Sequence, residues 1–197
     1  YTLTNLGTGN GFLVKYDASG NVVWARKEGG TSHDYMTSVA IDNTGDIYIT
    51  GYFSSPTMTF GSLTLNLTGG TYDLFIAKYD ASGNAKWVKS CTSTGPNANE
   101  YPQGITTDTQ NKVYIAGRFQ ALTMTFDGIT VTNSGPTQYD VFVAKMDNFI
   151  LPIELLDFNA KPNKVKKCVD IDWTTLSETN NDYFVVERSM DNKDFTE

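Results

Sequence analysis

The sequence of 197 residues predicts an all-β fold, in which part of a β-propeller is followed by part of a β-sandwich. Three observations support this prediction. A pattern repeats along residues 1–147, the apolar runs are short and rich in Val, Ile, Tyr, Phe and Thr, and no stretch shows a sustained helical period. Short runs of this kind, bounded by Gly, Asn, Asp and Ser, are typical of strands joined by tight turns.

The internal repeat consists of three aligned blocks. The first block, residues 11–21, returns as residues 74–84 at an offset of 63, and a third copy begins at Val141. The other two blocks recur at an offset of 66, and they are residues 46–53 with 112–119 and residues 57–60 with 123–126. Three blocks in the same order predict a repeat architecture.

One complete unit is predicted to form a four-stranded antiparallel blade with an extra ribbon. Its elements are an inner strand (37–42), a second strand (46–53), the ribbon (57–67), a third strand (73–80) and an outer strand (84–90). The next unit runs from residue 104 to residue 147 in the same order, without an outer strand.

The third strand is apolar on both faces. Phe75, Ala77 and Tyr79 fall on one face, and Leu74 and Ile76 fall on the other. Small antiparallel sheets are buried on both faces when they stack around an axis, as in a propeller. A solenoid is the alternative, but 63 to 66 residues is long for one coil.

The propeller part, residues 1–149, amounts to about two and a half blades. A closed propeller has roughly four to eight, so we expect this chain to be a fragment whose propeller lacks its N-terminal part. The last unit has no outer strand after Asp147. We expect the missing N-terminal segment to supply that strand and so to close the open edge.

The repeat has a distinctive composite pattern. It reads Phe-x-Ala-Lys-Tyr-Asp-Ala-Ser-Gly-Asn-x-x-Trp, then Gly-Gly, then Asp-Tyr, then Ile-x-x-Asp-x-x-Gly-x-Ile-Tyr-Ile-Thr-Gly-Tyr-Phe. This pattern resembles the bacterial β-propeller repeat called SBBP. The resemblance implies a propeller blade, often found in secreted or surface proteins, and it implies no chemistry.

A second module covers residues 150–197. A Pro-bounded strand (151–158) precedes a basic turn (161–167), and strands at 169–175 and 183–189 follow, with Trp173 expected in a buried position. Strands at these short intervals suggest an immunoglobulin-like sandwich.

This module opens with Leu-Pro-x-Glu-Leu-Leu-x-Phe and continues with Trp173 and the segments 177–184 and 186–189. These residues resemble the fibronectin type III-like module near the C-terminus of many type IX secreted bacterial proteins. Such a module takes about 100 residues, so we expect only its first half here. The resemblance implies type IX secretion and an extracellular or cell-surface location.

Composition excludes several classes of partner and site. The net charge of −7 makes a nucleic acid an unlikely partner, and no apolar run is long enough for membrane insertion. The single histidine, His33, excludes a multi-His metal site, and we expect neither a metal nor a cofactor. Cys91 and Cys168 lie in different modules, so two unpaired thiols are expected.

Candidate binding residues precede the two inner strands. Asp34 and Tyr35 align with Glu100 and Tyr101, which places all four on one rim of the propeller. An acidic and aromatic ring there could bind a sugar or a cation. The alternative is that each acid caps its loop and each tyrosine packs between blades. His33 occupies a variable loop position and is not predicted to be catalytic.

Two further features are predicted to be structural. Residues 42–46 are expected to form a tight turn and not a calcium loop, because the closing Glu is absent. Trp24 and Trp87 recur at fixed repeat positions, which favours a role in blade packing over sugar stacking.

We therefore expect a non-enzymatic extracellular or cell-surface scaffold or adhesion protein that contacts proteins or glycans. Self-association through open blade edges is a further option. One alternative is an accessory part of a secreted carbohydrate-active enzyme, which predicts carboxylate pairs facing the propeller axis. The other is a structural repeat of a surface filament.

Overall fold

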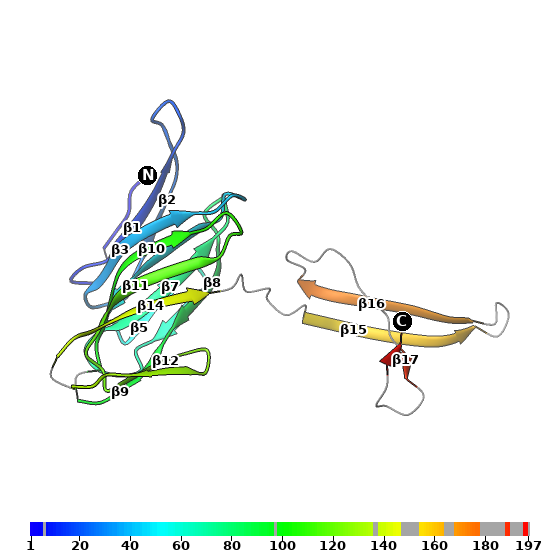
Figure 1. Ribbon diagram of the computed structural model, residues 1–197. Helices are drawn as coiled ribbons and strands as arrows, with labels where there is room; N and C mark the ends of the chain where they lie inside the picture. The colour runs from blue at the N-terminus through cyan, green and yellow to red at the C-terminus, as the bar shows by residue number, and fades with distance from the viewer. Residues whose placement is uncertain are drawn as a thin grey trace. The chain divides into compact units, whose positions relative to one another are not determined.

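The computed structural model describes residues 1–5, 7–96, 98–135, 138–146, 154–163, 168–177, 188–189 and 195–196. The regular structure of these residues consists of β-strands, which confirms the all-β prediction (Figure 1). No helix among them has the length and hydrophobicity needed to cross a bilayer. The chain divides into two compact units, Tyr1–Asn148 and Phe149–Glu197, and each is described separately.

The first unit contains one complete four-stranded sheet. Its strands are β3 (Asp34–Ile41), β4 (Ile47–Phe53), β7 (Asp73–Tyr79) and β8 (Ala85–Ser90). They pair antiparallel in the order β3-β4-β7-β8, so the predicted blade of inner, second, third and outer strands is confirmed.

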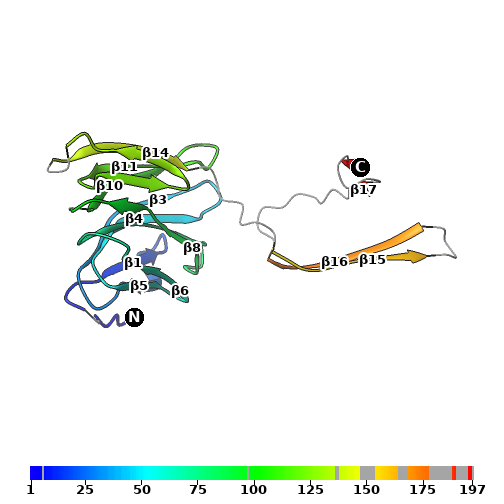
Figure 2. The ribbon, with the colours of Figure 1, turned by 90° about the horizontal axis from the view of Figure 1, so that it is seen from below.

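Incomplete copies of this sheet lie on either side of it. The preceding copy is the hairpin of β1 (Gly11–Tyr16) and β2 (Val22–Glu28), which correspond in the repeat to β7 and β8. The following copy has the order β10-β11-β14, formed by Glu100–Thr107, Val113–Phe119 and Asp140–Met146. Figure 2 shows the sheets of this unit stacked on one another, which is the arrangement of part of a propeller.

The predicted ribbon is present in both repeats. In the first it is the hairpin β5 (Thr57–Phe60) and β6 (Leu63–Asn66). In the second it is the hairpin β12 (Thr123–Phe126) and β13 (Ile129–Thr132). A short strand, β9 (Thr92–Thr94), pairs with the free edge of β12, so the sheet has the order β13-β12-β9. The repeat pattern did not predict β9, because it pairs with a segment from the next repeat.

Both inner strands begin earlier than the sequence predicted. β3 begins at Asp34 and not at residue 37, and β10 begins at Glu100 and not at residue 104. The backbone N–H of Asp34 donates to the carbonyl of Gly9 at 2.9 Å, and that of Glu100 donates to the carbonyl of Tyr72 at 3.2 Å. A bulge near the start of each strand hides this extension from a simple alternating pattern. The predicted site residues are therefore strand residues.

The predicted tight turn between β3 and β4 is confirmed. The Asp42 carboxylate accepts hydrogen bonds from the backbone N–H groups of Thr44 and Asp46, each at 3.0 Å. Gly45 has a φ of 85°, and Asn111 takes up a φ of 60° at the same place in the next repeat. Gly and Asn are the residues that tolerate this left-handed conformation best.

The third strand of the complete sheet, β7, is buried on both faces, as predicted. Every residue of β7 is buried, including Leu74 and Ile76 on the face toward the third sheet. The equivalent residues of β14, Val141 and Val143, are 85% and 76% exposed. The third sheet therefore covers this face of the second sheet, while the same face of the third sheet is exposed to solvent.

The two repeat tryptophans are buried, which confirms their predicted packing role. The Trp24 indole N–H donates to the carbonyl of Ala81 at 3.2 Å, and its ring lies directly beneath Gly83. Because a Cβ at position 83 would come within 2.8 Å of the ring, only glycine fits there.

Within the described residues of the second unit, the strands form two antiparallel pairs. A long hairpin joins β15 (Glu154–Asn163) to β16 (Cys168–Ser177). A smaller pair joins β17 (Arg188–Ser189) to β18 (Phe195–Thr196). Most of the predicted strand at 183–189, the turn at 164–167 and the side chain of Trp173 lie outside the described residues. The sandwich therefore stays a prediction.

Candidate functional site

Five tyrosine side chains of the first unit form a continuous aromatic group, which we call the tyrosine cluster: Tyr35, Tyr52, Tyr72, Tyr101 and Tyr139. Tyr52 lies at its centre, with ring centroids 4.9 Å from Tyr35, 5.3 Å from Tyr72 and 5.0 Å from Tyr101. Tyr139 joins through Tyr101 at 5.9 Å. These spacings are those of favourable tilted and edge-to-face ring pairs.

The repeat explains how the sheets bring these side chains together. One repeat supplies Tyr35 at the start of β3, Tyr52 near the end of β4 and Tyr72 just before β7. Antiparallel pairing places the start of β3 beside the end of β4, and Tyr35 is the direct cross-strand partner of Tyr52. The next repeat places Tyr101, Arg118 and Tyr139 at the equivalent positions. Arg118 therefore stands where the first repeat has Tyr52.

Cationic and hydrogen-bonding groups accompany the rings. The guanidinium carbon of Arg118 lies 4.5 Å from the ring centroid of Tyr139 and 5.5 Å from that of Tyr101. His33 stacks on Tyr35 at 6.1 Å. The outer rings are open to solvent, with Tyr35 41% and Tyr139 45% exposed. The cluster is thus an accessible aromatic surface with one exposed guanidinium.

The phenols of Tyr52 and Tyr101 are held in their uncharged form. Burial, followed by the neighbouring phenols of Tyr139, Tyr72 and Tyr52, raises the pKa of Tyr101 to about 12. Burial also raises the pKa of Tyr52, with smaller contributions from Tyr35 and Tyr72. These two hydroxyl groups can therefore both donate and accept hydrogen bonds at neutral pH.

The two predicted acids are not part of this surface. Asp34 is 3% exposed and Glu100 is fully buried. The Asp34 carboxylate accepts hydrogen bonds from the Gly30 N–H and the Ser55 hydroxyl, each at 2.7 Å, so it ties together neighbouring loops. The two acids do not form an open ring, because both are buried at the starts of β3 and β10. The hydrogen bonds of Asp34 agree with the alternative prediction, in which the acid caps its loop.

Glu100 has a different environment from Asp34. Neither oxygen of its carboxyl group meets a partner within hydrogen-bond distance and angle, although the Ser93 hydroxyl, the Leu74 backbone and the Cys91 thiol lie near enough to lower its pKa. Burial, with a smaller contribution from the charge of Asp73, raises its pKa to about 8. The free thiol of Cys91 lies beside it and is also buried, which raises the pKa of that thiol. Because this group is closed to solvent, it does not provide an acid–base pair for a substrate.

Of the predicted site residues, the structure brings Tyr35 and Tyr101 into one cluster and removes Asp34 and Glu100 from it. Sequence reasoning missed Tyr52, Tyr72, Arg118 and Tyr139. A signal for two of them was present, because Tyr72 and Tyr139 both stand directly before the third-strand block, 67 positions apart. In the part of the chain that the structure describes, no three His, Cys, Asp or Glu side chains are grouped to hold a metal ion.

Comparison with known proteins agrees with the repeated β-rich architecture. No profile of a known protein family matches the chain. The chain is 27% identical over 159 residues to an uncharacterized WD repeat-containing protein of Acanthamoeba polyphaga mimivirus. The match covers 76% of this chain and 11% of that protein, so the chain spans about a tenth of its relative's length. WD repeats form propeller blades, and the similarity is consistent with a partial propeller in this chain.

Proposed function

We propose that this chain is a non-enzymatic binding module that holds a protein partner on the tyrosine cluster. The observation that carries the proposal is the continuous, partly exposed set of five rings with Arg118 beside it. Tyr and Arg are enriched at protein interfaces and among the residues that contribute most to binding. The similarity to a WD repeat-containing protein supports a role in protein contacts.

The chemistry of the cluster favours one kind of partner segment. The tyrosines offer hydroxyl groups and apolar ring faces, while Arg118 and His33 offer N–H donors. A segment with a carboxylate near its centre, flanked by apolar or aromatic side chains, satisfies both parts. The chain's own net charge of −7 does not oppose this, because the exposed charge within the cluster is that of Arg118.

The finer parts of the proposal concern location and setting. We infer an extracellular or cell-surface scaffold or adhesion protein with SBBP-type blades and a fibronectin type III-like module, supported by the sequence resemblances. A glycan is the alternative ligand, since tyrosine rings can also stack on sugars. The burial of Asp34 and Glu100 gives no support to an accessory role in carbohydrate cleavage.

A peptide-display library selected on the immobilised chain tests the proposal. Binders retained by a chain with Tyr101→Ala and Arg118→Ala are subtracted, and a glycan array is probed in parallel. We expect enriched acidic-aromatic peptides that bind the unmodified chain and a Tyr16→Ala control equally, since Tyr16 is exposed but lies outside the cluster. No enrichment, or binders indifferent to the cluster substitutions, would overturn the proposal. Binding on the glycan array alone would identify the tyrosine cluster as a sugar-binding surface and overturn the proposed protein partner.

A further inference from the structure

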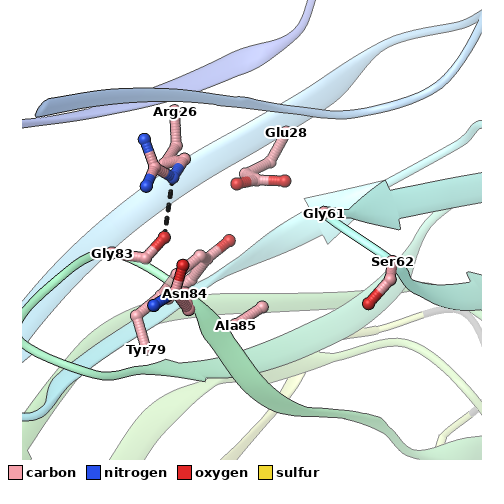
Figure 3. A pocket seen from close by; sticks show the side chains of 8 residues that line it. All are labelled: Arg26, Glu28, Gly61, Ser62, Tyr79, Gly83, Asn84 and Ala85. Carbon is pink, nitrogen blue, oxygen red and sulfur yellow. Dashed lines mark hydrogen bonds between the residues drawn. The ribbon is translucent and has the colours of Figure 1, made fainter.

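A pocket of about 170 Å³ lies between the first two sheets of the first unit (Figure 3). Arg26 and Glu28 line it from β2, Ser62 from the turn between β5 and β6, and Tyr79 from the end of β7. Gly83 and Asn84, from the turn that leads into β8, and Ala85, at the start of β8, complete the wall. The pocket is separate from the tyrosine cluster and shares no residue with it.

Two buried polar groups in this pocket lack partners. Glu28 and Tyr79 are each 1% exposed, and neither Glu28 Oε2 nor the Tyr79 hydroxyl meets a partner within hydrogen-bond distance and angle, although the Tyr79 hydroxyl lies near enough to the Glu28 carboxyl group to lower its pKa. Figure 3 shows both groups directed into the same space. Buried polar atoms are bonded in the great majority of cases, and each exception calls for an explanation. A ligand that forms hydrogen bonds with both atoms would explain why they are buried without a protein partner.

The charges around the pocket favour a neutral ligand. The Arg26 guanidinium is held by three backbone carbonyls: Nε donates to Gly83 at 2.7 Å, Nη1 to Ala25 at 3.1 Å and Nη2 to Ser82 at 3.2 Å. These bonds use part of its five N–H donors and leave others available. The Arg26 guanidinium and the Glu28 carboxyl group face the same space. Arg26 therefore repels a cationic ligand, and the ionised Glu28 repels an anionic one.

The next boundary in the same chain lacks this arrangement. Its equivalents of Glu28, Tyr79, Arg26 and Gly61 are, in order, Cys91, Met146, Lys89 and Asp127. Both of the polar groups without partners are replaced together, and Lys89 forms an ion pair with Asp127 at 2.9 Å. The polar pocket is therefore a special feature of the first boundary and not a by-product of the repeat.

We propose that this pocket binds a small neutral molecule with adjacent hydroxyl groups, the chemistry of one sugar ring or a polyol. One hydroxyl donates to Glu28 Oε2, and its neighbour accepts from the Tyr79 hydroxyl. A volume of about 170 Å³ is below the ~300–1,000 Å³ of sites for drug-sized ligands, which limits the ligand to roughly one ring.

Binding is coupled to pH through Glu28. Burial raises the pKa of Glu28 to about 7, while the Tyr79 hydroxyl, the Gly61 backbone N–H, Arg26 and Lys27 act in the opposite direction. The turn between β5 and β6 contributes only Gly61 and Ser62 to the lining, and neither carries a titratable side chain. A ligand hydroxyl that donates to Glu28 stabilises the ionised carboxylate. Affinity therefore rises as pH increases through about 7.

The test titrates D-glucose, D-galactose, myo-inositol and glycerol separately into the full chain at pH 6 and pH 8, with amide shifts followed by NMR. We expect at least one compound to give saturable shifts at Gly61 and Gly83, with tighter binding at pH 8. Glu28→Gln and Tyr79→Phe each weaken that binding about tenfold or more. The pair Glu28→Cys with Tyr79→Met, which copies the second boundary, abolishes it.

Thermal melting of each variant shows that the loss of binding is not a loss of fold. Tyr101→Ala leaves the sugar titration unchanged, so failure here and failure of the proposed protein contact are distinguishable. No saturable shift with any of the four compounds would overturn the inference and leave ordered water as the occupant. Shifts that persist in Glu28→Gln and Tyr79→Phe would overturn it as well.

Discussion

The Asn10 side-chain amide donates a hydrogen bond to the Asp34 carboxylate across the boundary between the first two sheets, with 3.3 Å between Asn10 Nδ2 and Asp34 Oδ2. At the equivalent positions of the next boundary the residues are Asp73 and Glu100. An amide and a carboxylate are thus replaced by two buried carboxyl groups. Because two like charges are costly in a buried site, one of these groups holds a proton.

This pair makes stability depend on pH in an uncommon direction. Burial and the charge of Asp73 raise the pKa of Glu100 from its ordinary 4.5 to about 8, so the folded chain binds more protons than the unfolded chain between these values. The contribution of Glu100 to the free energy of unfolding is fully present below about pH 4.5 and is lost as pH rises through about 8. We expect denaturant unfolding to show stability that falls by several kcal/mol over this window.

Glu100→Gln removes most of this pH dependence and makes the chain more stable than the unmodified protein at pH 8. The smaller contribution of Glu28, whose pKa is about 7, has the same sign and remains. Asp157→Asn, at an exposed position of β15, serves as the control and keeps the original profile. A Glu100→Gln profile that parallels the unmodified one would show that Glu100 is ionised in the folded chain.

Equivalent positions in β7 and β14 give a matched test of sheet packing. Ile76 is fully buried and Val143 is 76% exposed. We expect Ile76→Ala to lower the free energy of unfolding by about 2–5 kcal/mol and Val143→Ala to change it by less than about 0.5 kcal/mol. Urea denaturation measures both. Equal costs at the two positions would mean that the third sheet does not cover β7.

Tyr52 is expected to hold the tyrosine cluster together. It contacts three rings at about 5 Å, and each such pair contributes about 0.5–1.5 kcal/mol. Tyr52→Ala is therefore expected to cost about 2–4 kcal/mol in thermal or chemical unfolding. Tyr52→Phe keeps the ring and should cost little. If Tyr52→Ala were as mild as Tyr16→Ala, the rings would not stabilise one another.

The Asp42 turn gives a prediction about calcium. Its carboxylate is satisfied by Thr44, Asp46 and Tyr48 within the turn and β4. We expect neither added Ca²⁺ nor EDTA to change the melting temperature, while Asp42→Ala lowers stability by about 1–3 kcal/mol through the lost hydrogen bonds. A rise in melting temperature with Ca²⁺ that Asp42→Ala abolishes would make the turn a metal site.

Much of the first unit could be predicted from sequence because its signals are local and repeated. The blocks around Tyr48 and Phe75 mark β4 and β7, and the Asp42 turn follows from Asp and Gly at fixed positions. Alternation alone could not set the start of β3, because the hydrogen bond from Asp34 to Gly9 belongs to the preceding repeat.

The candidate sites were harder to predict because they depend on contacts between repeats. Asp34 and Tyr35 are neighbours in sequence, yet one is buried between sheets and the other opens to solvent. Alternation in a strand sends adjacent side chains to opposite faces, and the early start of β3 decided which face each took. Glu28 and Tyr79 lie 51 positions apart, and nothing in the sequence joins them.

The central claim, that the tyrosine cluster is the binding surface, is tested most directly by one affinity comparison. Calorimetric titration of a selected peptide measures Kd for the unmodified chain and for the Tyr101→Ala, Arg118→Ala and Tyr16→Ala variants. We expect the two cluster substitutions each to raise Kd about tenfold or more, with Tyr16→Ala unchanged. Equal Kd values for all four proteins would contradict the account.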